Sequence, residues 1–348
     1  MKIAVLAPVA WRTPPRKYGP WEQVASNITE GLVAQGMDIT LFATRDSLTN
    51  GKLDYICPRG YEEDPKADAK VWEGMHISYL MEKAHQFDLI HNHFDFLPLT
   101  YSRLIKTPMV TTIHGFSSSK IIKVYERYNT TNNYVSISYA DRSSRLKYRA
   151  NVYHGIKSQD FTFKENPEDY LLYFGRIHHD KGAYEAIQIA KRTKMRLLLS
   201  GYVQDEYYFL EKVKPYLNED IKYVGNSGPQ KRDRLLGGAR ALLHPINFEE
   251  PFGLSVAEAM FCGTPVIAFN RGSMQELIAD KKTGFLVDNV EEAVEAVQNL
   301  KSIKRAACHR WAQAKFSQQQ MVKNYLALYK DILADRLYLD VNRKSLTL

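Results

Sequence analysis

The chain has 348 residues, 45% of them hydrophobic and 25% charged, a composition that fits two folded domains and argues against general disorder. Its net charge of +8 suits an anionic partner or an anionic membrane surface, but Lys and Arg are dispersed, so nucleic-acid binding is the weaker interpretation. No apolar run reaches the ~20 residues that cross a bilayer, and three scattered cysteines predict neither disulfides nor a zinc site, so we expect a cytoplasmic protein, with peripheral membrane contact left open.

In the first half of the chain, short apolar runs alternate with amphipathic stretches. The apolar runs predict strands at Lys2–Ala7, Asp38–Phe42, Leu89–His91, Met109–Ile113, Tyr134–Ile137 and Asn151–Tyr153. Helical spacing of apolar residues predicts helices at Trp21–Gln35 and Lys70–Gln86.

The second half of the chain repeats this rhythm. Strands are predicted at Tyr170–Phe174, Arg196–Ser200, Ile221–Val224, Ala241–Leu243, Pro265–Ala268 and Gly284–Val287. Helices are predicted at Ala183–Lys191, Glu206–Leu217, Gln230–Gly237, Gly253–Phe261, Ser273–Ile278, Val290–Leu300, Ile303–Lys315 and Gln318–Ala334.

Strand–helix alternation at this spacing predicts an α/β protein with two doubly wound parallel sheets. The polar stretch 155–169 separates the two strand series and is the expected interdomain linker. We therefore expect a first domain at residues 1–158 and a second at 159–317. A last helix near 318–334 would pack back on the first domain, and residues 335–348 would form a tail. Ligands of such folds bind at the carboxyl ends of the strands, so both sheets would face one cleft.

The segment His244–Met260 (HPINFEEPFGLSVAEAM) follows an apolar strand and opens a helix. Its glycine, Gly253, lets the backbone approach a ligand closely. The amides of Phe252, Gly253 and Leu254 lie in a first helical turn, where they can meet an anion. Glu250 and Glu258 flank that turn, and two acceptors so spaced suit a polyhydroxylated ligand. On their own, these two glutamates are better explained as an acid favourable to a helix N-terminus and a solvated surface residue.

This stretch resembles the signature of family-four retaining glycosyltransferases of the GT-B fold, in which a glutamate, Pro-Phe-Gly and a second glutamate follow in this spacing. The stretch Cys262–Asp288 is also similar to that family. The resemblance covers nearly the whole chain and implies two Rossmann-like domains, with the nucleotide-sugar donor held by the second and the acceptor by the first. It implies that Glu250 contacts the donor sugar and that Glu258 holds the ribose hydroxyls.

The loop Gly175–Gly182 (GRIHHDKG) carries a second match. Arg176 and Lys181 lie five residues apart on one strand-to-helix loop and can converge on a diphosphate. Two solvated cations at a helix start are the plainer interpretation of the loop alone. The resemblance implies that Arg176 and Lys181 clamp the donor phosphates.

Three glycines that follow strands are further candidates for the donor site. Gly201 and Gly225 end neighbouring strands and resemble loops that approach the nucleotide base. Gly19 lies in a loop after the first strand, where the family usually shows two glycines over the diphosphate. Pro20 takes the second place here and removes one amide donor, so we expect only Gly19 to keep that role.

Histidines and an aspartate follow strands of the first domain. His114 ends a buried strand, where a lone histidine is as often structural as functional; the resemblance places it beside the donor sugar. His91, His93 and Asp95 share a strand face, which raises a metal interpretation. The family works without a metal, so we expect none, and no other cofactor, and take His93 and Asp95 as acceptor contacts.

The implied reaction is the transfer of a hexose, with retention of its anomeric configuration, from a nucleotide diphosphate sugar to an acceptor hydroxyl. A UDP-sugar, with glucose as the preferred hexose, is the expected donor, while the acceptor (a small molecule, glycan or lipid) stays open. A sugar-nucleotide epimerase or a phosphorylase on the same plan is a second interpretation, although no site for a lysine-bound pyridoxal phosphate is evident. A non-catalytic nucleotide-sugar binding protein is a third.

Overall fold

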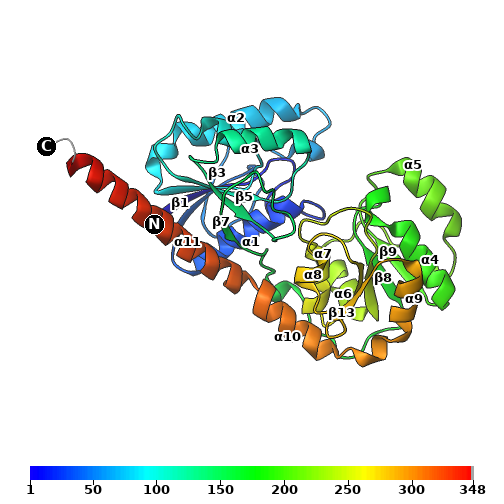
Figure 1. Ribbon diagram of the computed structural model, residues 1–348. Coiled ribbons are helices and arrows are strands. Elements are labelled where there is room, and N and C mark those ends of the chain that lie inside the picture. The colour runs from blue at the N-terminus through cyan, green and yellow to red at the C-terminus, as the bar shows by residue number, and fades with distance from the viewer. Residues whose placement is uncertain (346–348) are drawn as a thin grey trace.

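The computed structural model describes residues 1–345, with side chains through residue 336. It consists of two α/β units, and a long C-terminal helix runs from the second unit across the first (Figure 1). Each unit contains one parallel sheet with helices on its faces, as the alternation in the sequence predicts.

The sheet of the first unit has seven parallel strands in the order β3-β2-β1-β4-β5-β6-β7. Their bounds are β1 Lys2–Leu6, β2 Asp38–Phe42, β3 Lys52–Asp54, β4 Leu89–Asn92, β5 Met109–Ile113, β6 Asn133–Ser136 and β7 Tyr148–Asn151. The helices of this unit are α1 Pro20–Ala34, α2 Ala69–Glu82 and α3 Ile122–Arg127. The central strands are buried along their length, which is why they read as continuous apolar runs.

The sheet of the second unit has six parallel strands in the order β10-β9-β8-β11-β12-β13. Their bounds are β8 Leu171–Phe174, β9 Leu197–Ser200, β10 Ile221–Tyr223, β11 Ala241–His244, β12 Val266–Phe269 and β13 Gly284–Val287. The helices are α4 Ala183–Thr193, α5 Glu206–Tyr208, α6 Pro229–Gly238, α7 Leu254–Phe261, α8 Met274–Leu277, α9 Val290–Gln298 and α10 Arg305–Phe316.

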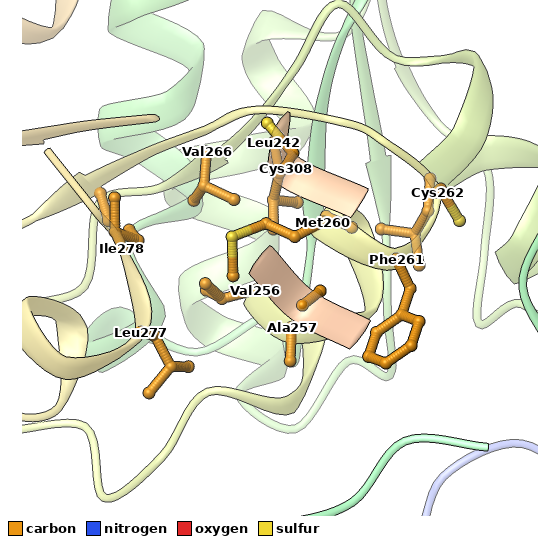
Figure 2. Close-up of a cluster of buried hydrophobic side chains, with 14 of the residues drawn as sticks. Leu242, Val256, Ala257, Met260, Phe261, Cys262, Val266, Leu277, Ile278 and Cys308 are labelled. Carbon is orange, nitrogen blue, oxygen red and sulfur yellow. The ribbon is translucent and has the colours of Figure 1, made fainter. Parts of the chain in front are cut away.

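Helix α7 is the best-buried helix of the second unit. Its side chains pack with strands β11 and β12 and with Cys308 of α10, as Figure 2 shows around Met260. Six of its eight residues are buried, including Glu258. This packing fixes the position and direction of the helix, and its first turn therefore points into the space between the units from a rigid base.

The chain crosses between the units twice, at one place. The amide of Ile156 donates to the carbonyl of Phe316 (2.7 Å), and the amide of Gln318 donates back to Ile156 (2.9 Å). The side chain of Gln318 also donates to the carbonyl of Asn27 (2.7 Å). Helix α11 (Gln318–Ser345) begins here and packs against α1 through a cluster that contains Tyr325 and Tyr329. The last helix thus leaves the second unit and lies on the first.

Some elements differ from the prediction. Strand β7 ends at Asn151 instead of beginning there, and the edge strand β3 and the short helix α3 were missed. The helix expected at Glu206–Leu217 is broken into α5, a π-turn (Phe209–Val213) and a 3-10 turn (Lys214–Tyr216), because Pro215 cannot continue a helix. The prediction of a tail was wrong for residues 335–345, because α11 continues to Ser345.

Candidate active site

A cleft of about 950 Å³ lies between the two units and is lined by both. Its walls include most of the candidate residues: Gly19, Asp95, His114, Arg176, Lys181, Gly201, Glu250, Phe252, Gly253, Leu254 and Glu258. His93 and Gly225 do not line it. Residues that are up to 239 positions apart in the sequence thus face one space, as two facing sheets predict.

The start of α7 is shaped by glycines. Gly253, the N-cap residue, has φ 90°, a left-handed conformation that favours glycine. A Cβ on Gly272 would lie 2.4 Å from the backbone nitrogen and oxygen of Glu250, so the two loops touch backbone to backbone. Ser273 ties them further, because its hydroxyl donates to the carbonyl of Phe252 (2.7 Å). The loop before α7 is therefore held in one position.

Glu250 forms a buried ion pair. Its Oε2 lies 2.6 Å from Lys181 Nζ and 3.5 Å from His244 Nε2, and the side chains of Glu250 and Lys181 are 11% and 14% exposed. Burial works against ionisation of Glu250, but the charge of Lys181 and the contact with His244 lower its pKa to about 2. Glu250 is a carboxylate at neutral pH and presents a negative charge in the cleft.

Glu258 forms a second buried pair, with Arg232 of α6 at 3.2 Å. Burial raises the pKa of Glu258, and the charge of Arg232 opposes that rise. Arg232 lines the cleft and lies 5.1 Å from the centre of the Phe161 ring. Sequence reasoning missed Arg232, since the run Lys231–Arg234 looks like a solvated start of a helix. The one available signal was the position of that helix after strand β10, on the same sheet edge.

The loop after β8 brings Arg176 and Lys181 to the same cleft. The Tyr173 hydroxyl donates to the carbonyl of Arg176 (2.6 Å), and the Arg176 guanidinium donates to Gln204. Gly182 has φ 73°, and a Cβ there would lie 1.8 Å from the carbonyl oxygen of Pro245. Only glycine permits this approach, which places Lys181 beside Glu250.

The two strand-end glycines differ in position. Gly201 lines the cleft, and a Cβ there would lie 1.7 Å from the carbonyl oxygen of Gly175. Gly225 lies behind it and accepts a hydrogen bond from the Gly201 amide (3.2 Å). Asn226 and Ser227, the next residues, line the cleft instead. Gly225 is thus one residue removed from the surface it was predicted to form.

The loop before α1 covers the cleft from the first unit. Gly19 has φ 146°, and Pro20 is the first residue of α1, a position at which the missing amide costs nothing. The carboxylate of Glu22 accepts from the amide of Trp11 (3.2 Å) and is 3% exposed. Burial raises the pKa of Glu22 to about 7. This loop presents an apolar wall and a carboxyl group that is half-protonated near neutral pH.

His114 belongs to a row of buried imidazoles, His91, His93, His114 and His154, called here the histidine relay. His93 Nδ1 lies 3.0 Å from His114 Nε2, and His114 Nδ1 lies 3.3 Å from His154 Nε2. Burial lowers the pKa of His114 to about 3 and that of His91 likewise. His114 and His154 line the cleft, whereas His93 is fully buried. The prediction that His93 contacts the acceptor has no support in this arrangement.

Asp95 lies on the first unit's side of the cleft. Its backbone has φ 82°, unusual for a residue other than glycine. Tyr125 donates to one carboxylate oxygen (2.5 Å) and Ser117 to the other (3.3 Å). Burial raises the pKa of Asp95 to about 6, against the effect of these two bonds. The ligand atoms of His91, His93 and Asp95 are not grouped with metal-ligand spacing.

One other group of side chains, among those the structure describes, has metal-ligand spacing. Ligand atoms of His178, His179 and Asp205 lie within 4.8 Å of one another. These groups already contact each other and Asp180, with His179 Nε2 3.1 Å from the Asp180 carboxylate. Contacts among these side chains on and beside the loop Gly175–Gly182 therefore explain their closeness without a bound metal ion.

With this geometry in hand, two family descriptions match the chain. Residues 21–153 match glycosyltransferase family 4, and residues 156–318 match glycosyl transferases group 1. The chain belongs to the group 1 glycosyltransferases. The boundary between the two matches falls at the hydrogen-bonded crossing near Ile156.

Known proteins similar to this group 1 glycosyltransferase include an uncharacterized protein and a mannosyltransferase. A protein of the cps region of Klebsiella pneumoniae is 32% identical over 171 residues, 46% of each chain. The O-antigen chain mannosyltransferase B of Escherichia coli is 28% identical over 209 residues, 56% of this chain and 52% of that one. The chain thus spans about half the length of these curated relatives.

Solved structures show the GT-B fold for this group 1 glycosyltransferase. Sucrose-phosphate synthase of Thermosynechococcus elongatus superposes with a TM-score of 0.79 at 18% identity, covering 96% of this chain and 100% of that one. Anabaena HepE, in complex with UDP and glucose, superposes with a TM-score of 0.74 at 17% identity, covering 95% and 99%. Among the described residues, no helix is long and apolar enough to span a bilayer.

Proposed function

We propose that this chain transfers a hexose from a nucleotide diphosphate sugar, UDP-glucose or a related UDP-sugar, to an acceptor hydroxyl, with retention of configuration and without a metal ion. The observation that carries the proposal is the pair of buried glutamates at α7, each held by a cation. Glu250 with Lys181 and Glu258 with Arg232 face the cleft at the helix start. The relative that was solved with UDP and glucose supports the donor class.

In the proposed reaction, charge grows on the leaving diphosphate as the bond to the sugar breaks. Arg176, Lys181 and the amides at the start of α7 supply fixed positive charge and dipoles for it, which is electrostatic catalysis. Glu250 orients the sugar and Glu258 the ribose. The acceptor attacks from the face that the diphosphate leaves, and its proton departs with the diphosphate, so no protein nucleophile is assigned.

The other candidate positions take supporting roles in this proposal. Gly19 and Gly201 allow the donor to approach the backbone of both units, and Gly225 supports Gly201 from behind. Asp95 contacts the acceptor, and His114 lies beside the sugar. A binding protein without turnover, or an epimerase on the same fold, would use the donor half of the cleft in the same way, so turnover decides between them.

The test is nucleotide release from UDP-glucose, UDP-galactose and UDP-N-acetylglucosamine, first with water as acceptor and then with a panel of sugars. Glu250→Gln should lower turnover by about 100-fold or more, the usual effect of removing one group that acts in the transition state. Glu249→Gln is the matched control, because Glu249 is exposed and does not line the cleft. Undiminished turnover in Glu250→Gln would sink the proposal.

Two further measurements complete the test. Proton NMR of the glycosidic product should show the anomeric configuration of the donor sugar, and an inverted product would contradict the retaining mechanism. Full activity after treatment with EDTA is expected, and loss of activity that added metal restores would overturn the metal-free assignment. Donor binding without release of nucleotide would favour the binding protein.

A further inference from the structure

The histidine relay continues into helix α11. The hydroxyl of Tyr329 lies 2.6 Å from His91 Nδ1, and His91 Nε2 lies 2.7 Å from the hydroxyl of Thr112. That hydroxyl in turn lies 2.6 Å from the hydroxyl of Tyr325. Tyr325 and Tyr329 are 1% and 0% exposed. A continuous row of five buried polar side chains, from Tyr329 through the histidine relay to His154, therefore joins the last helix to the cleft.

The imidazoles in this row are neutral, because burial lowers the pKa of every one of them well below neutrality. A neutral imidazole has one N–H donor and one acceptor nitrogen. Each imidazole that is bonded on both sides must therefore donate on one side and accept on the other. The hydrogen bonds along the row then all run from donor to acceptor in the same direction, and two directions are possible. The group that determines the direction of the bond at one end therefore determines the tautomer of every imidazole.

Tyr329 is that group. A phenol is a stronger acid than a neutral imidazole N–H, and an imidazole nitrogen is a better acceptor than a phenol oxygen. Tyr329 thus donates to His91 Nδ1, and His91 donates from Nε2 to Thr112. His93 Nε2 lies 3.3 Å from the same His91 Nδ1 and carries its hydrogen toward it, sharing that lone pair at longer range, because two unprotonated nitrogens would repel each other. His114 Nε2 then donates to His93 Nδ1, and His154 Nε2 donates to His114 Nδ1.

We propose that Tyr329 of helix α11 sets the tautomer of the histidine relay, holding all four imidazoles as Nε2–H and leaving His154 with an acceptor Nδ1 at the cleft end. His154 is thereby a ligand-binding residue, because a hydroxyl of the sugar donor that reaches its ring meets an acceptor. Tyr329 is a positioning residue that never touches the ligand. The part that concerns the donor rests on the proposed function, whereas the tautomers do not.

Both nitrogens of His114 are engaged within the relay, by His93 and His154. Its ring face stacks on Trp21, with centroids 5.4 Å apart. His154 packs edge-on against Phe252 at the start of α7, with centroids 4.9 Å apart. The end of the relay thus contacts both the loop of the donor unit and the first helix of the acceptor unit. Its polarity is set from α11, which packs with α1 in the core of the first unit.

The experiment uses the full chain labelled with 15N-histidine. Long-range 1H–15N correlation spectra at neutral pH distinguish Nε2–H from Nδ1–H tautomers, and single replacements assign the ten histidines. We expect the relay signals as Nε2–H in the wild type. Tyr329→Phe should convert His91 and His114 partly or fully to Nδ1–H. Tyr170→Phe is the matched control, because it removes a buried tyrosine hydroxyl outside the relay, one that donates to the carbonyl of Leu235 (2.8 Å), and it should leave the tautomers unchanged.

Nδ1–H tautomers in the wild type, or unchanged tautomers in a folded Tyr329→Phe, would overturn the proposal. Melting temperatures of both variants show that folding is kept. In Tyr329→Phe the Kd for the UDP-sugar should rise about threefold to tenfold, the range expected for one neutral hydrogen bond. If the tautomers change as expected and the Kd does not, the relay stands and the contact of His154 with the donor is refuted. If no UDP-sugar binds the wild type, the proposed function fails and the tautomers still decide on the relay.

Discussion

Replacing Lys181 by Met tests the electrostatics of the cleft. The ion pair with Glu250 lowers the pKa of this carboxyl from 4.5 to about 2, a shift that corresponds to about 3 kcal/mol of stability. Removal of the cation leaves a carboxylate whose side chain is 11% exposed, with the His244 imidazole 3.5 Å away. Breaking a buried pair from one side costs ~3–5 kcal/mol in other proteins, so we expect a loss of about 3 kcal/mol in the free energy of unfolding at pH 7.

Urea unfolding followed by circular dichroism measures this loss. Because the folded pKa of Glu250 is lowered, the stabilisation is present above pH 4.5 and declines as the pH falls toward 2, so the deficit of Lys181→Met should shrink below pH 4.5. The double variant with Glu250→Gln should recover most of it. Lys52→Met is the control, since Lys52 and Asp38 also form an ion pair (3.0 Å) but are 66% and 46% exposed. Equal losses in Lys181→Met and Lys52→Met would refute the reasoning.

Three other predictions concern stability. Gly201→Ala should lower the free energy of unfolding by about 3 kcal/mol, because the added Cβ would lie 1.7 Å from a carbonyl oxygen. Gly74→Ala in α2, where nothing lies within 4 Å of the added Cβ, should raise it by about 0.5–1 kcal/mol. Urea unfolding of both variants should give changes of opposite sign. Asp95→Asn should raise the melting temperature more at pH 8 than at pH 4. The reason is that burial raises the pKa of Asp95 from 3.8 to about 6, so the wild type loses stability as the pH rises from 3.8 to 6. An equal change in melting temperature at both pH values would contradict this. Arg305→Met should cost about 3 kcal/mol or more, since the buried guanidinium donates to four backbone carbonyls and to the hydroxyl of Thr264. A loss below 1 kcal/mol would contradict this expectation.

The part of the candidate site around the start of α7 was readable from the sequence because its residues are contiguous. Glu250, Gly253 and Glu258 lie within one loop and the helix that follows it, so their spacing fixes their relative positions. Arg176 and Lys181 share one loop in the same way. The strand ends that carry these residues were also predicted, since buried parallel strands give continuous apolar runs. The fold class follows from the same pattern, whereas the GT-B arrangement was implied by the resemblance of His244–Met260 to the glycosyltransferase family.

Contacts between distant segments were not readable. Arg232 pairs with Glu258 only because α6 and α7 pack side by side, and no local pattern distinguishes it from neighbouring surface charges. The histidine relay forms from three strand ends and α11, whose tyrosines look like ordinary core residues in the sequence. Strand β3 was missed because an edge strand of three residues has no alternation to detect. The extension of α11 beyond residue 334 has no apolar face that predicts it.

The central claim, a nucleotide-sugar site at the start of α7, is tested most directly by thermal unfolding in the presence of UDP, GDP, ADP and their sugar conjugates. A ligand at 100 times its Kd adds about 2.7 kcal/mol to the stability of the folded state, which gives a clear rise in melting temperature. We predict that one nucleotide series, that of UDP, stabilises the wild type and that Glu258→Ala abolishes the rise. No stabilisation by any of these nucleotides would contradict the assignment of the donor site.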